Sequence, residues 1–130
     1  MNTTYGFGKK LDIPYEQAVA NATAALKEEG FGVLTEIDVK ATLKKKLGVD
    51  FRRYVILGAC NPPFAYQALS TELEIGLLLP CNVIVYEAKD GGTVVSALNP
   101  MAALGVVDNP AMLGVAEQVT AKIKRAIDSL

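Results

Sequence analysis

Histidine and tryptophan are absent from this chain of 130 residues, and cysteine occurs only twice. Without histidine the chain cannot form a Cys–His catalytic pair, in which the imidazole takes the proton of the thiol. Two cysteines also supply too few ligands for a tetrahedral zinc site. These absences exclude Cys–His enzymes, and the sequence favours a protein that is not a catalyst.

A strong net charge is missing as well. The 13 Lys and Arg residues nearly balance the 14 Asp and Glu residues, which leaves a net charge of −1 and no general attraction to nucleic acid or anionic membranes. No apolar run approaches the roughly 20 residues that span a bilayer. The first residues, Met1 to Tyr5, lack the basic and apolar regions of a secretion signal. We therefore expect a cytoplasmic protein with reduced thiols and no nucleic-acid or membrane partner.

The residues that are present favour one folded domain spanning residues 1–130. Hydrophobic residues make up 51% of the chain and charged residues 21%, as in ordinary globular domains. Hydrophobic periodicity and turn residues predict strands at residues 3–10, 33–37, 54–59, 77–86 and 93–98. Long helices are predicted between Pro14 and Gly30 and from Pro110 to Leu130.

Shorter elements fill the gaps between the strands. Asp38 and Asn61 are each positioned to cap a short helix, and residues 101–107 read as a packed loop or a single turn. The helix after Asp38 is expected to turn Val39, Leu43 and Leu47 inward. The sequence thus predicts an α+β fold of β-α-β-β-β-β-α order, with a five-stranded, mainly antiparallel sheet. Two long helices should lie on one face of the sheet.

The strands at residues 54–59 and 83–86 are apolar on both sides, although two helices can cover only one face. Something must therefore cover the second face. A second copy of the chain is the simplest choice and predicts a homodimer, whereas the loops at residues 60–80 and 99–108 are the alternative.

Each cysteine is followed by an asparagine, in Cys60-Asn61 and Cys81-Asn82. If the strands that carry the two cysteines are antiparallel neighbours, both thiols lie at the same end of the sheet. Cys60, Asn61, Cys81 and Asn82 then form a candidate ligand-binding set. Cys60 and Cys81 alone are candidate ligands for a soft metal ion such as Cu(I).

Three functions remain open for this pair. The chain could bind a small ligand or a soft metal, it could be a thiol-dependent redox protein, or both cysteines could fill the core of a structural or partner-binding dimer. Cys60 precedes a helix start, which favours its thiolate, although Pro62 and Pro63 remove helix donors there. Apolar burial should keep Cys81 protonated. Cys60→Ser should accordingly remove most uptake of a soft metal.

Two groups of charged residues are better explained as solvated surface. Glu72 and Glu74 are the carboxylates that the spacing places near the cysteines, at the end of a short helix. A basic group follows Asp38, and no aromatic residue is interleaved within residues 40–46 to stack on bases. The basic group comprises Lys40, Lys44, Lys45, Lys46, Arg52 and Arg53.

Three blocks of sequence carry a resemblance to a known family. FGVLTEID at residues 31–38, LGACNP at residues 57–62 and IGLLLPCNV at residues 75–83 occur in the order found in the bacterial and archaeal family called domain of unknown function 302. The resemblance covers nearly the whole chain. It implies an α+β fold and a homodimer, and it implies no established activity.

Overall fold

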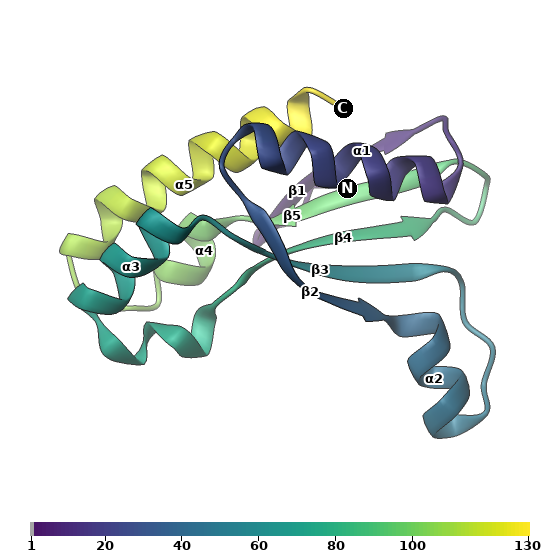
Figure 1. Cartoon of the computed structure of the whole chain (residues 1–130), viewed down its shortest axis with the longest axis horizontal. Helices are drawn as coiled ribbons and strands as arrows, with labels where there is room; N and C mark the ends of the chain where they lie inside the picture. The colour runs from purple at the N-terminus through teal and green to yellow at the C-terminus, as the bar shows by residue number, and fades with distance from the viewer. Residues whose placement is uncertain (1) are drawn as a thin grey trace.

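Five antiparallel strands form a single sheet in the computed structural model, which describes residues 2–130 (Figure 1). The strands lie in the order β1-β5-β4-β3-β2, and every neighbouring pair is antiparallel. Their bounds are β1 (Gly6–Leu11), β2 (Gly32–Asp38), β3 (Tyr54–Cys60), β4 (Cys81–Glu87) and β5 (Thr93–Leu98). The predicted antiparallel sheet is confirmed.

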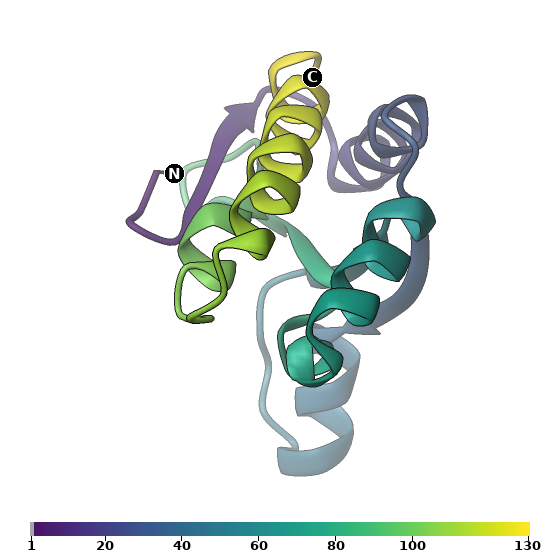
Figure 2. The same ribbon diagram turned by 90° about the vertical axis from the view of Figure 1, so that its left-hand side faces the viewer.

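The long helices lie along one side of this sheet, as Figures 1 and 2 show. The long helices α1 and α5 pack over the strands, and α3 packs against α5 beyond the strand ends. Three elements are shorter: α2 between β2 and β3, the 3-10 helix η1 between α3 and β4, and α4 between β5 and α5. The bounds are α1 (Tyr15–Glu28), α2 (Val39–Leu47), α3 (Pro62–Thr71), η1 (Leu73–Leu78), α4 (Pro100–Leu104) and α5 (Ala111–Asp128). The predicted α+β class is confirmed.

The core lies between the sheet and α1 and α5. Alternate residues of the central strands face the helices because side chains alternate along a strand. Small alanines on α1 allow its backbone to approach the sheet closely. The buried residues of this layer are Ala18, Ala22, Leu26, Val55, Leu57, Val83, Val85, Val95, Ala97, Val119, Ile123 and Ile127.

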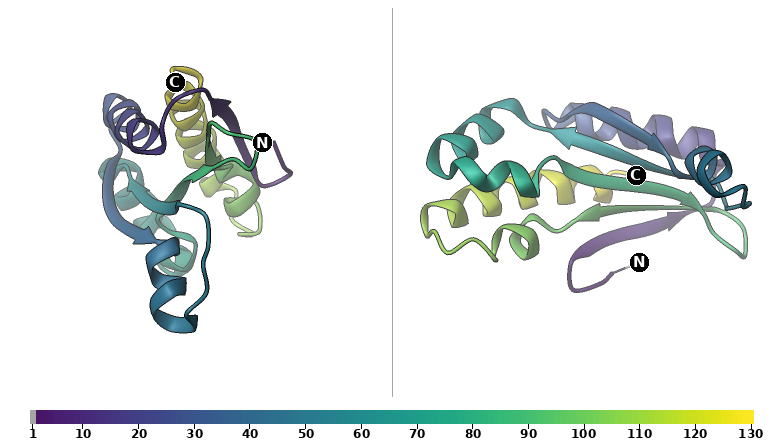
Figure 3. Two further views of the ribbon diagram at one scale, coloured as in Figure 1. Left: turned by 90° about the vertical axis from the view of Figure 1, so that its right-hand side faces the viewer. Right: turned by 90° about the horizontal axis from the view of Figure 1, so that it is seen from below.

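Within residues 2–130, no helix packs flat against the opposite face of the sheet (Figure 3, right). Ile56 and Ile84 are half-buried on this face, and the rings of Tyr54 and Tyr86 stack 5.3 Å apart. A shallow hollow of about 430 Å³ on this face is lined by none of the residues 60–80 or 99–108. We call this face of the sheet the open face.

Two local predictions are wrong. The strand predicted at residues 77–86 starts too early: Leu77 and Leu78 belong to the 3-10 helix η1, and β4 begins at Cys81, directly after Pro80. Helix α2 contains no buried residue: Val39 and Leu43 are half-buried, and Leu47 is 69% exposed. The cause is the direction of α2, which extends away from the sheet instead of packing on it.

Arg53 fixes α1 against the sheet rather than belonging to a free basic surface. Its guanidinium bonds the Glu87 carboxylate at 2.8 Å and also pairs with Glu16 of α1. It lies 4.9 Å from the centre of the Tyr15 ring, so a cation–π contact adds to the ion pairs. These contacts raise the pKa of Arg53 and lower that of Glu87.

Candidate functional site

The register of β3 and β4 brings the two cysteines to one end of the sheet. Ala59 is directly opposite Cys81, so Cys60 is one residue beyond that pair. The prediction that antiparallel pairing would bring them together is confirmed. Both thiols are free, and both line the same cavity.

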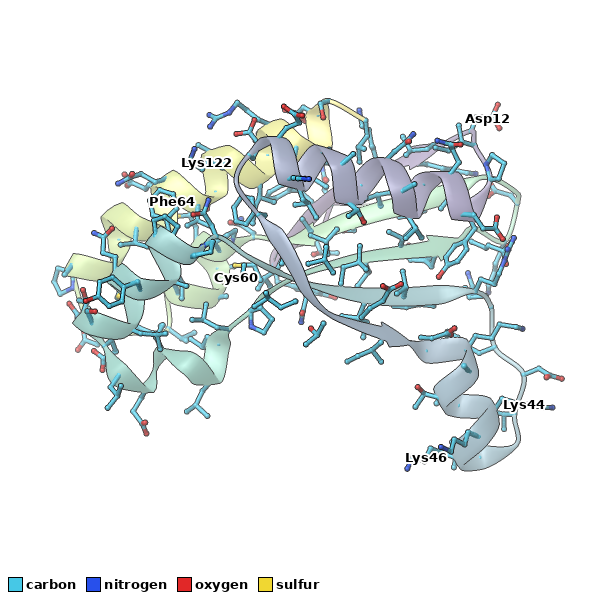
Figure 4. All side chains as sticks on the ribbon, viewed as in Figure 1. Asp12, Lys44, Lys46, Cys60, Phe64 and Lys122 are labelled. Carbon is cyan, nitrogen blue, oxygen red and sulfur yellow. The ribbon has the colours of Figure 1, made fainter. Side chains whose placement is uncertain are left out.

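This cavity has a volume of about 280 Å³ and lies between the ends of β3 and β4 and helices α3 and α5. We call it the cysteine cavity. Figure 4 shows Cys60 where β3 leads into α3, and Phe64 on that helix. Leu34 and Leu69, which are 67% and 37% exposed, mark the opening near the edge strand β2. The rest of the wall is almost wholly apolar and consists of Phe31, Ala59, Phe64, Ala65, Ala68, Leu79, Pro80, Leu104, Val115 and Val119.

Asn61 is the only amide in the wall, and its nitrogen is already in use. It holds the N-cap position of α3, where its carbonyl accepts from Ala65 N at 2.9 Å. Its side chain makes no capping bond, and Pro63, at the second helical position, has no N–H to donate to it. Instead Asn61 Nδ2 donates to the Glu29 carbonyl at 3.3 Å and joins α3 to the end of α1.

Burial controls the chemistry of Cys81. Apolar surroundings raise the pKa of its thiol to about 11, and the nearby Cys60 adds to the shift. Cys81 is therefore a neutral thiol at physiological pH, in agreement with the expectation that apolar burial keeps it protonated.

Asn82 lies outside the cysteine cavity. Side chains alternate along β4, so Cys81 faces the helices and Asn82 faces the open face, where it is exposed. Glu72 and Glu74 do not line the cavity either: Glu72 accepts from Asn109 Nδ2 at 3.1 Å, and Glu74 is exposed. The structure brings together Cys60, Asn61 and Cys81 and leaves the other three polar side chains elsewhere.

The cavity walls themselves were not identified as functional from the sequence. Phe31, Phe64 and Val115 come from three distant segments, and each alone reads as an ordinary core residue. The only available signal was the apolar character of the helix that follows Asn61. Within residues 2–130 no group of three or more His, Cys, Asp or Glu residues is placed to hold a metal ion.

Comparison with known proteins identifies the family. The family model described as "Domain of unknown function DUF302" matches residues 7–130. The chain belongs to the DUF302 family. A solved structure of an uncharacterized conserved DUF302 protein from Bacillus stearothermophilus is 29% identical, with a TM-score of 0.89 over 97% of this chain and 98% of that one. No curated protein matches the chain.

The family assignment agrees with the fold and leaves the activity of this DUF302 protein open. Among residues 2–130, no helix combines the length and apolar character needed to cross a bilayer.

Proposed function

We propose that this DUF302 protein is a homodimeric binding protein whose ligand is a small, uncharged and mainly apolar molecule held in the cysteine cavity. The observation that supports this most directly is an open cavity of about 280 Å³ with an almost wholly apolar wall. Cavities of this kind, with few polar groups, are typical of small-molecule sites.

The wall determines the class of ligand. No charged residue lines the cavity, and Asn61 already spends an amide hydrogen on Glu29. An ionic ligand would lose its hydration without gaining a partner. The side-chain oxygen of Asn61 and the two thiols allow one weak polar contact with the ligand.

The soft-metal alternative has less support. A thiol must lose its proton to bind a metal, and the raised pKa of Cys81 opposes this step at neutral pH. The same protonation slows any redox cycle that would begin with attack by Cys81. We also propose a reducing, cytoplasmic location, because two thiols that line one cavity are both unpaired.

Binding of an uncharged apolar fluorophore, N-phenyl-1-naphthylamine, tests the proposal. The wild-type protein should bind one probe per chain, and decanol should displace it. Ala65→Trp fills the cavity from α3 and should weaken binding at least about tenfold. Ala24→Trp, at an exposed position of α1, is the matched control and should bind as the wild type does. Equal binding by Ala65→Trp and Ala24→Trp would place the probe elsewhere and contradict the proposal.

The homodimer is supported by the open face. Half-buried Ile56 and Ile84, with the stacked Tyr54 and Tyr86, form an apolar surface over which no helix lies. A second copy pressed face to face would remove this surface from water.

Sedimentation tests the dimer. The wild type should sediment at about twice its chain mass of 13.8 kDa at micromolar concentration. Ile84→Lys puts a charge in the middle of the open face and should give a monomer, whereas Ala24→Lys on α1 should leave the dimer intact. A wild-type species of 13.8 kDa at tens of micromolar would refute the dimer.

A further inference from the structure

Two segments extend past the open face at opposite ends of the strands. Helix α2 lies between β2 and β3 and so stands at the Tyr54 end, whereas η1 immediately precedes β4 and stands at the Cys81 end. Figures 1 and 3 show both segments on the side of the sheet away from α1 and α5. Together they frame the open face at its two ends.

Both segments expose leucines. Leu47 of α2 is 69% exposed, and Leu73 and Leu77 of η1 are 82% and 83% exposed. A nine-residue helix is marginal without tertiary packing, and α2 buries none of its residues within the single chain. Large exposed side chains that gather around an open sheet face mark an interaction surface.

The two segments carry opposite charge. Helix α2 contains four lysines and no acidic residue, and Lys45 and Lys46 form no ion pair within residues 2–130. Figure 4 shows Lys44 and Lys46 at the far end of this helix, away from the body. By contrast, residues 54–86 contain no lysine or arginine, and the exposed Glu74 lies in η1 just after Glu72.

We propose that, in the homodimer, α2 of each chain seats on η1 of its partner. This inference rests on the proposed dimer and specifies how the two open faces meet. A two-fold axis can lie in the plane between the two facing sheets and be perpendicular to the strands. Such an axis places the α2 end of one chain over the η1 end of the other. Leu47 then covers Leu73 and Leu77, and the lysines approach Glu74. An axis along the strands would instead gather the lysines of both α2 helices at one end, where they repel.

A charge exchange tests the seating at low ionic strength. Lys45→Glu with Lys46→Glu, and separately Glu74→Lys, should each weaken self-association about tenfold, since each places like charges across both α2–η1 contacts. An equimolar mixture of the two variants should form heterodimers about as tight as the wild-type dimer, because both contacts regain opposite charges. Lys124→Glu, at an exposed position of α5, is the control and should change nothing.

Sedimentation equilibrium of each variant and of the mixture measures these affinities. If Glu74→Lys dimerises as tightly as the wild type, or if the mixture associates no better than its components, the seating is wrong. If Ile84→Lys abolishes the wild-type dimer and the charge variants do not weaken it, the seating is wrong and the dimer proposal stands. A monomeric wild type would overturn both.

Discussion

At the level of single residues, the two thiols of the cysteine cavity differ in surroundings although they are close in register. Cys81 belongs to the layer of β4 that faces the helices, and burial raises the pKa of its thiol to about 11. Roughly one Cys81 thiol in a thousand is then ionised at pH 8. Cys60 is at the end of β3, just before α3 begins.

Alkylation rates follow from this difference. Because the thiolate is the reacting species, iodoacetamide at pH 7.5 should modify Cys60 at least about tenfold faster than Cys81 in the folded protein. Mass spectrometry of the two cysteine peptides measures both rates. Protein unfolded in urea is the control, where the two rates should converge. Faster labelling of Cys81 in the folded protein is the result that would contradict the expectation.

The same shift makes stability depend on pH. The thiol has an ordinary pKa of 9.0 and a folded pKa of about 11, so above pH 9 the unfolded chain releases this proton first. The contribution of Cys81 is therefore complete below pH 9 and falls by up to about 3 kcal/mol as the pH rises to 11. Urea unfolding of the wild type and of Cys81→Ala, compared between pH 8 and 11, measures it. The variant should lack this part of the decline; parallel curves would show that burial does not shift the thiol.

At the level of elements, Gly58 of β3 permits a close approach that shapes the cavity. A Cβ atom there would lie 2.1 Å from Thr35 Oγ1 and 2.8 Å from Pro80 Cγ. The threonine hydroxyl can rotate away, but the proline ring cannot. Pro80 also belongs to the cavity wall, so a side chain at position 58 would disturb both the packing of β3 and this part of the wall.

Gly58→Ala should consequently lower the free energy of unfolding by about 1–3 kcal/mol and weaken binding of the naphthylamine probe. Gly114→Ala is the matched control: it lies in α5, nothing is within 4 Å of its added Cβ, and it should stabilise the helix by about 0.5–1 kcal/mol. Urea denaturation measures both changes. A Gly58→Ala protein as stable as the wild type would show that Pro80 can move without cost.

The elements also show where the sequence was informative. The sheet and long helices were predictable because alternation, helical spacing and the Gly91-Gly92 turn specify them locally. The meeting of Cys60 and Cys81 followed from antiparallel pairing alone. Residues 77–80 were read as the start of a strand because a short apolar run has no distinctive period, although Leu77 and Leu78 end the 3-10 helix η1. The cavity could not be predicted, since its walls are brought together only by tertiary packing.

For the molecule as a whole, the sheet separates the proposed ligand site from the proposed dimer surface. The cysteine cavity lies on the side of α3 and α5, whereas the proposed dimer surface is the open face. Ala65 lines the cysteine cavity and Ile84 lines the hollow on the open face, and the two have no wall residue in common. Changes at separate sites without shared partners usually act additively, to within about 0.5 kcal/mol.

Ligand binding and dimerisation should therefore be nearly independent. The monomeric Ile84→Lys protein should bind N-phenyl-1-naphthylamine within about threefold of the wild-type affinity, and Ala65→Trp should dimerise within about threefold of the wild type. Fluorescence titration and sedimentation, each performed on both variants, give the two constants. Pro80 is a physical link between the sides, since it lines the cavity and packs on Gly58. If either variant changes the other affinity by much more than threefold, the partner chain moves Pro80. Gly58→Ala should then change both the affinity for the probe and the affinity of the dimer.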